Sequence, residues 1–520
     1  MKSNIIGQPW LLLWAIMLMA ACTPPVEVDV LITGGWVLDG SHSPARRLDV
    51  GVTGERISYV GVPGERKVIG KAVVDIDGLY LAPGFIDPHT HVERELSDPK
   101  QKSNLRYLRQ GVTTVFAGND GSSPMPVKRK LDEWDRNGIG TNAALLVGHG
   151  SVRRVVMGME AKEADAQALK EMEKLVHKSM EEGAFGISTG LFYAPGSFAT
   201  MEEVIALSKV VSAHDGIYDT HMRDEGSYNI GLMNAVKETI AIGEKAGVKV
   251  HISHIKCLGT DVWDKSPEVI KLVEDAKKRG VHVTANQYPY LASRTSLKAA
   301  LVPRWAEDGG YEKMVERFDD PGLRDTLVAG ITENLRKRGG PESLIFSDAV
   351  DETMNGKSLG DIAKKWEMDL PETTMQVLRQ DGGIKVISFN MKESDLERFM
   401  QQPWVMTGSD GGAGHPRQFG TFPRKMHQYV EVEKVIDLPF MVHSSSGLTA
   451  ETFGVKERGF VKEGYYADLI VFDPEKVKDI ATFERPYEEA QGMDYVWVNG
   501  ELIINQGNYT GKLAGKALRK

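Results

Sequence analysis

Apolar and polar residues alternate at both ends of the chain, and glycines interrupt the alternation. Apolar residues at every second position are typical of β-strands with one buried face. The segments with this pattern are residues 28–40, 49–52, 56–61, 464–473 and 495–504. Both ends of the chain are rich in predicted strands, whereas the middle has another pattern. We therefore predict one small β-sandwich, assembled from residues 26–83 and 443–520.

The middle of the chain alternates short apolar runs with longer helical stretches. The predicted strands are residues 85–86, 113–117, 143–147, 184–188, 216–221, 248–254, 281–288 and 404–410, and the clearest helices are 165–182, 229–246 and 267–279. Eight strands that alternate with helices predict an α/β fold of the (β/α)8 TIM-barrel type over residues 84–442. The stretch between strands seven and eight is too long for a simple connection, so residues 300–345 are predicted to form an inserted lid.

Histidine and aspartate recur where the predicted strands end. His89 and His91 follow Phe85-Ile86, and positions i and i+2 of a strand face the same way. Any one such residue is more often a hydrogen-bonded core histidine or a turn aspartate than a ligand. Catalytic groups of a barrel, however, gather at the C-terminal ends of its strands. The whole set suits one or two divalent ions, most simply Zn²⁺, and comprises His89, His91, Asp120, His221, His254 and Asp410.

Composition and charge are those of an ordinary globular protein. The 520 residues are 41% hydrophobic and 26% charged, and 63 basic residues against 72 acidic ones give a net charge of −9. No dense cluster of lysine and arginine is present, which argues against a nucleic-acid partner.

The N-terminus reads as a targeting segment. Lys2 precedes the apolar run Trp10–Ala21, which is too short for an ordinary transmembrane helix. The sequence Leu18-Met-Ala-Ala-Cys22 resembles a bacterial lipoprotein box, although Met19 stands where leucine is usual; a plain signal peptide is the alternative. We expect residues 1–22 to be a lipoprotein signal peptide and Cys22 to be lipidated. The protein would then be exported to the periplasm and anchored to the outer membrane, because Thr23 rather than aspartate follows Cys22.

Several longer motifs resemble a known family. The sequence Pro83-Gly-Phe-Ile-Asp-Pro-His-Thr-His91 is similar to the signature of the amidohydrolase superfamily, and other stretches resemble its D-aminoacylase (N-acyl-D-amino-acid deacylase) branch. These stretches are Gly111-Val-Thr-Thr-Val, Gly190-Leu-Phe-Tyr-Ala-Pro195, Thr220-His-Met-Arg-Asp-Glu225, Ile252-Ser-His-Ile-Lys256, Tyr288-Pro-Tyr-Leu-Ala292, Gly408-Ser-Asp-Gly, His415-Pro-Arg-Gln-Phe-Gly-Thr-Phe-Pro-Arg424 and Arg458-Gly-Phe-Val-Lys-Glu-Gly-Tyr-Tyr-Ala-Asp468. The resemblance covers residues 27–510.

The resemblance implies a metal arrangement. His221 and His254 would hold the tighter zinc ion, and His89, His91 and Asp410 would surround a second, weaker or vacant site. Asp120 occupies the position at which characterised D-aminoacylases carry a cysteine. A carboxylate can bridge two ions, so this departure leaves open whether one or two zinc ions bind.

The resemblance also implies a reaction, hydrolysis of an N-acyl-D-amino acid or a dipeptide containing a D-residue. A zinc-bound hydroxide would attack the amide, and Asp410 would be the catalytic group that carries a proton to the leaving nitrogen. Tyr193, Lys256 and Tyr288 are expected to bind the substrate carboxylate. Arg223 would orient the substrate or pair with Asp224 or Glu225. Arg294 would bind an anionic group of the substrate or pair with Glu307 or Asp308 of the lid.

Two alternatives stay open at this stage. A cyclic-amide hydrolase of the hydantoinase or dihydroorotase kind usually carries a lysine at the end of strand four, where this chain has Ile187-Ser-Thr-Gly190. A lipoprotein binding module that has lost its chemistry would account for the change at Asp120. The other five metal-ligand candidates are intact, which argues against that second alternative.

Overall fold

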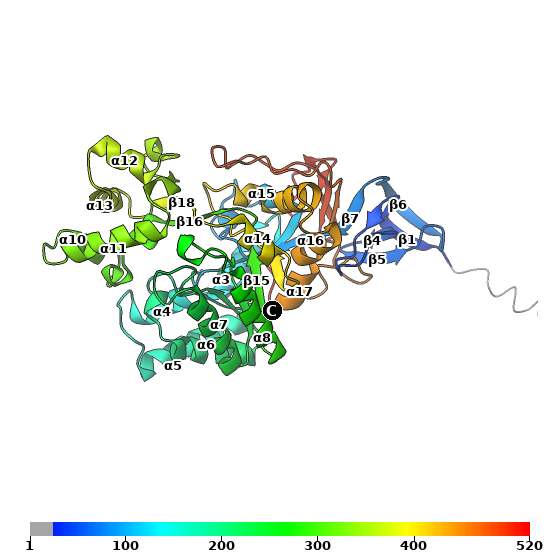
Figure 1. The fold of residues 1–520 in the computed structure, drawn as a ribbon. Coiled ribbons are helices and arrows are strands. Elements are labelled where there is room, and N and C mark those ends of the chain that lie inside the picture. Colours follow the sequence, from blue (N-terminus) through cyan, green and yellow to red (C-terminus); the bar gives the residue numbers. More distant parts are fainter. Residues whose placement is uncertain (1–23) are drawn as a thin grey trace, which may run out of the picture.

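The computed structural model describes residues 24–520, and Figure 1 shows three parts: a barrel, a β-sandwich beside it and an inserted segment on another side. The predicted signal segment and the lipidation site at Cys22 lie outside the described residues. Among residues 24–520, no helix is both long and apolar enough to cross a membrane.

Eight parallel strand positions form the barrel, as the alternation of apolar runs predicted. The strands are β8 (Phe85–Asp87), β9 (Val112–Ala117), β10 (Asn142–Leu145) continued by β11 (Val147–Gly148), β12 (Gly186–Gly190), β13 (Ile217–His221), β14 (Lys249–Ile252), β15 (Val283–Gln287) and β19 (Val405–Thr407). Each pairs in parallel with its neighbours in the order β8-β9-β10 and β11-β12-β13-β14-β15-β19. A parallel bridge between Thr90 and Gly411 joins the last strand to the first and closes the ring.

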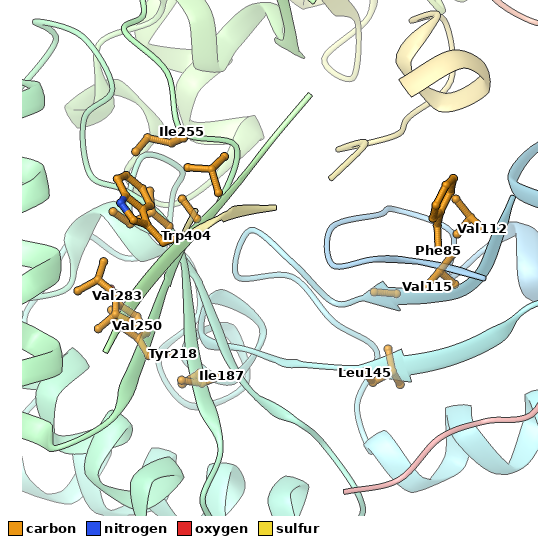
Figure 2. Packing of buried hydrophobic residues seen from close by; sticks show 14 of the residues in the cluster. Phe85, Val112, Val115, Leu145, Ile187, Tyr218, Val250, Ile255, Val283 and Trp404 are labelled. Carbon is orange, nitrogen blue, oxygen red and sulfur yellow. The ribbon is translucent and has the colours of Figure 1, made fainter. Parts of the chain in front are cut away.

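Helices cover the barrel. They are α2 (Leu105–Leu108), α3 (Val127–Asn137), α4 (His149–Met157), α5 (Ala166–Glu181), α6 (Met201–Ala213), α7 (Leu232–Ala246), α8 (Ser266–Lys278), α14 (Glu393–Met400), α15 (Arg417–Arg424), α16 (Leu438–Ser445) and α17 (Gly447–Phe453). Helix α5 begins where Asp165 accepts a hydrogen bond from the backbone of Ala168 at 2.8 Å, which caps an otherwise unpaired N–H group. Figure 2 shows the apolar side chains of the barrel, among them Phe85, Val115 and Val250, which belong to one continuous core.

Strands from both ends of the chain build the β-sandwich. One sheet has the order β5-β4-β1-β6 and contains β1 (Val26–Thr33), β4 (Asp49–Thr53), β5 (Arg56–Gly61) and β6 (Val68–Asp75). The other has the order β23-β22-β21-β20-β7-β2-β3 and contains β2 (Trp36–Val37), β3 (Arg46–Arg47), β7 (Tyr80–Pro83), β20 (Leu469–Phe472), β21 (Met493–Val498), β22 (Glu501–Asn505) and β23 (Asn508–Tyr509). Antiparallel pairing of β7 with β20 joins the two ends of the chain.

The C-terminal part of the sandwich begins later than the predicted boundary at residue 443. Its first strand, β20, starts at Leu469, whereas α16 and α17 pack against the barrel strands β8 and β19. The Phe453 ring lies 4.6 Å from the Phe116 ring in the barrel wall, between ring centroids. The helices therefore bury their apolar residues on the barrel, which sequence alternation alone did not reveal.

The inserted segment is a compact unit larger than the predicted residues 300–345. Strands β16 (Ala292–Ser296) and β17 (Leu344–Ser347) both pair with β18 (Lys385–Phe389) in an antiparallel sheet. The helices of the segment are α9 (Leu297–Leu301), α10 (Tyr311–Phe318), α11 (Arg324–Lys337), α12 (Leu359–Trp366) and α13 (Leu370–Gln380). They share an apolar core with the sheet, separate from the barrel core. Because β16 and β18 enclose the helices, the segment runs from 292 to 389.

Candidate metal centre

All six predicted metal ligands come together at the C-terminal ends of the barrel strands. Their donor atoms form two overlapping groups, and within each group these atoms lie within 4.8 Å of one another. One group comprises His89, His91, Asp120 and Asp410, and the other comprises Asp120, His221 and His254. Residues from five different strand ends thus meet at one place, as in other barrels with functional sites.

Asp120 lies between the two pairs of histidines. Its Oδ1 atom is 3.5 Å from His89 Nε2, 3.4 Å from His254 Nε2 and 3.7 Å from His221 Nδ1. Its Oδ2 atom is 3.6 Å from His91 Nε2. A carboxylate in this position faces both groups at once, so it can donate one oxygen to each of two ions.

Buried atoms of the centre lack protein partners. Both ring nitrogens of His89 and the Oδ1 atom of Asp120 are shielded from solvent and make no hydrogen bond among the described residues. Buried polar atoms without partners are costly, and a cation among them removes that cost. Nitrogen and carboxylate donors are the ligands that zinc accepts in proteins, so the residues present fit zinc.

Three of these ligands have left-handed backbone conformations. The φ angles are 53° at Asp120, 37° at His254 and 47° at Asp410. Positive φ is uncommon outside glycine and clusters at functional sites, where the surrounding structure must hold it. The chain therefore turns sharply at each of these strand ends.

The two carboxylates of the centre stay ionised. Burial by itself would raise the pKa of Asp120 and of Asp410, but His89 beside Asp120 and Arg417 beside Asp410 hold both values well below the usual range. Arg417 Nη1 lies 2.9 Å from Asp410 Oδ2. Asp410 Oδ1 faces the other way, 3.3 Å from His91 Nε2.

The centre opens into a cavity of about 450 Å³ between the barrel and the inserted segment. Four of the predicted substrate-binding residues line it, namely Tyr193, Lys256, Tyr288 and Arg294. The Tyr288 hydroxyl is buried and has no hydrogen-bond partner among residues 24–520, which leaves it free to bind a ligand. Lys256 Nζ is 2.6 Å from the carboxylate of Glu225.

Arg223 lies outside this cavity, contrary to prediction. Its guanidinium pairs with Glu238 on α7 and donates hydrogen bonds to the carbonyls of Ser197 and Ala199, at 3.1 and 3.0 Å. The prediction assumed that strand alternation continues past His221, but β13 ends at that residue. Arg223 therefore stabilises the loop after strand four, and neither Asp224 nor Glu225 is its partner.

Arg294 enters the cavity from β16 of the inserted segment. Its Nη2 atom is 3.4 Å from Asp348 Oδ2, so its acidic neighbour differs from both residues proposed for it. Glu307 pairs instead with Arg304 and Asp308 with Arg317. Burial lowers the pKa of Arg294 to about 10, and Lys385, which also lines the cavity, has a pKa lowered by burial and by Arg294.

Sequence reasoning missed two residues of the site. Arg417 lines the cavity, contacts Asp410 and lies over the ring of Tyr288. Glu225 lines the cavity too and contacts His254. Both belong to motifs noted above, His415-Pro-Arg and Thr220-His-Met-Arg-Asp-Glu225. Their charge and their closeness in sequence to predicted metal ligands could have identified them.

Comparison with known proteins places the chain in a family. The model of the amidohydrolase family matches residues 72–504. The chain belongs to the amidohydrolase family. This amidohydrolase is 35% identical to the D-aminoacylase of Alcaligenes xylosoxydans xylosoxydans, over 95% of the present chain and 98% of that protein. It is 31% identical to the N-acyl-D-glutamate deacylase of the same organism, over 92% and 94% of the two chains.

A solved structure shares the complete architecture of this amidohydrolase. It is the N-acyl-D-glutamate deacylase of Bordetella bronchiseptica, complexed with zinc and a phosphonate inhibitor that mimics the tetrahedral intermediate of the reaction. The TM-score is 0.81 at 30% identity, and the match covers 95% of the present chain and 100% of the other. The (β/α)8 fold predicted from the sequence is thereby confirmed.

Proposed function

We propose that this amidohydrolase is a zinc-dependent enzyme that cleaves the amide bond of N-acyl-D-amino acids or of dipeptides containing a D-residue. One observation carries the proposal: two histidine pairs converge on Asp120 at the floor of a cavity lined by basic side chains. The relatives that match nearly the whole chain are a D-aminoacylase and deacylases of N-acyl-D-amino acids, which supports this substrate class.

The residues of the centre divide the work of hydrolysis. His221, His254 and Asp120 would hold one zinc ion, and His89, His91, Asp120 and Asp410 would hold a second. Zinc supplies Lewis acidity and lowers the pKa of a bound water to near neutral. Asp410, anchored by Arg417 on one oxygen, has its other oxygen turned toward the histidines, where it can accept a proton from water and deliver it to the leaving nitrogen.

Basic residues in the cavity suit a substrate with a free carboxylate. Lys256, Tyr288 and Arg417 lie beside the centre and would bind the α-carboxylate. Arg294 and Lys385 belong to the inserted segment and would face the side chain of the substrate. An anionic side chain, as in D-glutamate or D-aspartate, would pair with Arg294, because a guanidinium binds carboxylates through two parallel hydrogen bonds.

The end of strand four does not favour a cyclic-amide hydrolase. That strand end carries Ser188 and Thr189 and no lysine. The Thr189 hydroxyl donates a hydrogen bond to the Thr220 hydroxyl at 2.7 Å. At Gly190, an added Cβ atom would lie 2.2 Å from the Asp120 carbonyl oxygen, so no larger side chain fits without moving the metal-binding loop.

The deciding experiment is a substrate screen with zinc-loaded protein. N-acetyl-D-amino acids, their L-enantiomers, L-Xaa-D-Xaa dipeptides and dihydroorotate are compared at equal concentration, with release of the free amine as the readout for the linear amides. Hydrolysis of D- but not L-substrates supports the proposal. Turnover of dihydroorotate alone, or of no amide at all, would contradict it.

We further propose that the protein is exported and anchored by a lipid on Cys22. The sequence Leu18-Met-Ala-Ala-Cys22 supports this, with Lys2 and the apolar run before it. Expression with a radiolabelled fatty acid tests the proposal, since the native chain should incorporate label and Cys22→Ser should not. Label in both chains, or in neither, would contradict it.

A further inference from the structure

Glu225 contacts both histidines of one half of the metal centre. It follows His221 by four residues and is almost fully buried. Its Oε1 atom lies 2.9 Å from His254 Nδ1, and its Oε2 atom lies 3.7 Å from His221 Nε2. In each ring, the nitrogen that faces Glu225 is the one opposite the nitrogen that faces Asp120.

This arrangement determines which ring nitrogen is free to bind a cation. A neutral imidazole has one N–H group and one lone pair, and the hydrogen bond made by one nitrogen decides the state of the other. A carboxylate that accepts the N–H group of His254 at Nδ1 leaves the lone pair on Nε2. At His221 the other carboxylate oxygen lies 3.7 Å from Nε2, too far for a hydrogen bond. Its negative charge there favours the opposite tautomer, with the N–H group on Nε2 and the lone pair on Nδ1. Both lone pairs then point to one place, where these nitrogens are 2.9 Å apart.

Lys256 completes the arrangement by neutralising the carboxylate. Its Nζ atom is 2.6 Å from Glu225 Oε1 and 2.8 Å from His254 Nδ1. An ammonium group that donated to His254 Nδ1 would leave the proton of that ring on Nε2 and block the ligand position. When Nε2 binds a cation, the proton of the ring must stand on Nδ1, and of the two neighbours of that atom only the Glu225 oxygen can accept it. The same carboxylate accepts from Lys256, so the pair avoids a buried uncompensated charge.

We infer that Glu225 is a positioning residue, which fixes the tautomers and the orientation of His221 and His254 for metal binding. The inference rests on the proposed metal centre and extends it. Carboxylates behind ligating histidines commonly have this effect, and their loss costs about 10- to 100-fold in metal affinity or activity. Here one carboxylate accepts from His254 and lies close to His221 as well.

The test measures metal binding and needs no substrate. Zinc affinity of the full-length protein is determined by competition with a chromophoric chelator, and the visible absorption spectrum of the Co²⁺-loaded protein reports the ligand geometry. The variants are Glu225→Gln, which removes the negative charge but keeps the size of the side chain, and Glu225→Asp, whose carboxylate is withdrawn by one methylene group. Glu238→Gln is the matched control, because Glu238 is a partly buried carboxylate that pairs with Arg223 and touches neither histidine.

We expect zinc affinity at the tighter site to fall by about 10- to 100-fold in Glu225→Gln, with an altered Co²⁺ spectrum, and by less in Glu225→Asp. Glu238→Gln should keep the affinity and spectrum of the wild type. Wild-type affinity and spectrum in either Glu225 variant, once it is shown to be folded by circular dichroism, would overturn the inference. A wild-type protein that binds zinc but cleaves no amide contradicts the proposed function alone, whereas one that binds no zinc contradicts both.

Discussion

At the scale of single residues, Asp120 couples the two halves of the centre. Its Oδ1 atom faces His221, His254 and His89, and its Oδ2 atom faces His91. The family resemblance implies a cysteine at this position in D-aminoacylases, and a thiolate has one donor atom. The carboxylate offers two oxygens, which favours more even occupancy of the two positions.

Substitution of single histidines should separate the two halves. His254→Ala removes a donor from the group with Asp120 and His221, so metal content should fall at the tighter site, whereas His89→Ala should mainly affect the second site. Metal analysis after dialysis against zinc-containing buffer measures both. Full metal content in His254→Ala would disprove the assignment of that ligand.

Asp410 is expected to matter for turnover more than for the tighter ion, because it belongs only to the group of His89 and His91. Asp410→Asn keeps the shape of the side chain but cannot accept a proton. Turnover should fall by about 10²- to 10⁴-fold, the usual contribution of general acid–base catalysis. Steady-state kinetics and metal analysis of the same sample test this. A variant that keeps more than about a tenth of wild-type turnover argues against the role.

Arg294 offers a test of substrate charge. Arg294→Met removes the guanidinium and keeps most of the side-chain volume, so KM should rise for N-acetyl-D-glutamate and stay near the wild-type value for N-acetyl-D-methionine. Asp348→Asn is the control, since it frees Arg294 from its ion pair and should not weaken binding of the acidic substrate. Equal losses on both substrates in Arg294→Met would instead indicate a structural role in the inserted segment.

At the scale of elements, sequence pattern predicted the strands well because their constraints are local. Buried parallel strands are short apolar runs, and the ligands stand at the strand ends or within three residues of them, so His89, His221 and Asp410 could all be located. The periodicity of the sequence did not predict side-chain directions where the chain leaves regular secondary structure. The direction of Arg223 depends on the end of β13, and the ion pair of Arg417 with Asp410 depends on a loop conformation that no periodicity specifies.

The inserted segment has its own core, which separates its stability from that of the barrel. Phe346 on β17 is 1% exposed within that core. Removal of a buried phenylalanine side chain costs about 3–5 kcal/mol. Phe346→Ala should accelerate amide hydrogen exchange across residues 292–389 and raise KM, because Arg294 is held by that sheet. Metal content and exchange in the barrel strands should not change; faster exchange in both regions would show that the two parts unfold together.

At the scale of the whole molecule, a buried polar network joins the β-sandwich to the barrel. Asp468 pairs with Arg458, accepts a hydrogen bond from the Asn499 backbone at 2.7 Å and accepts another from Asn142 at 3.1 Å. Asn142 begins the barrel strand β10, whereas Asn499 follows β21 of the sandwich. The two ends of the chain are therefore tied to the barrel by satisfied polar groups as well as by apolar contacts.

This network predicts strongly non-additive effects on stability. Asp468→Leu leaves the Arg458 charge buried and unpaired, which typically costs about 3–5 kcal/mol, and Arg458→Met leaves Asp468 in the same state. The double variant Arg458→Met/Asp468→Leu buries no uncompensated charge, so its loss should be clearly smaller than the sum of the two single losses. Chemical denaturation of the wild type, both single variants and the double variant measures the difference. Additive losses would show that the ion pair contributes little, and that the hydrogen bonds of Asn142 and Asn499 hold the sandwich to the barrel instead.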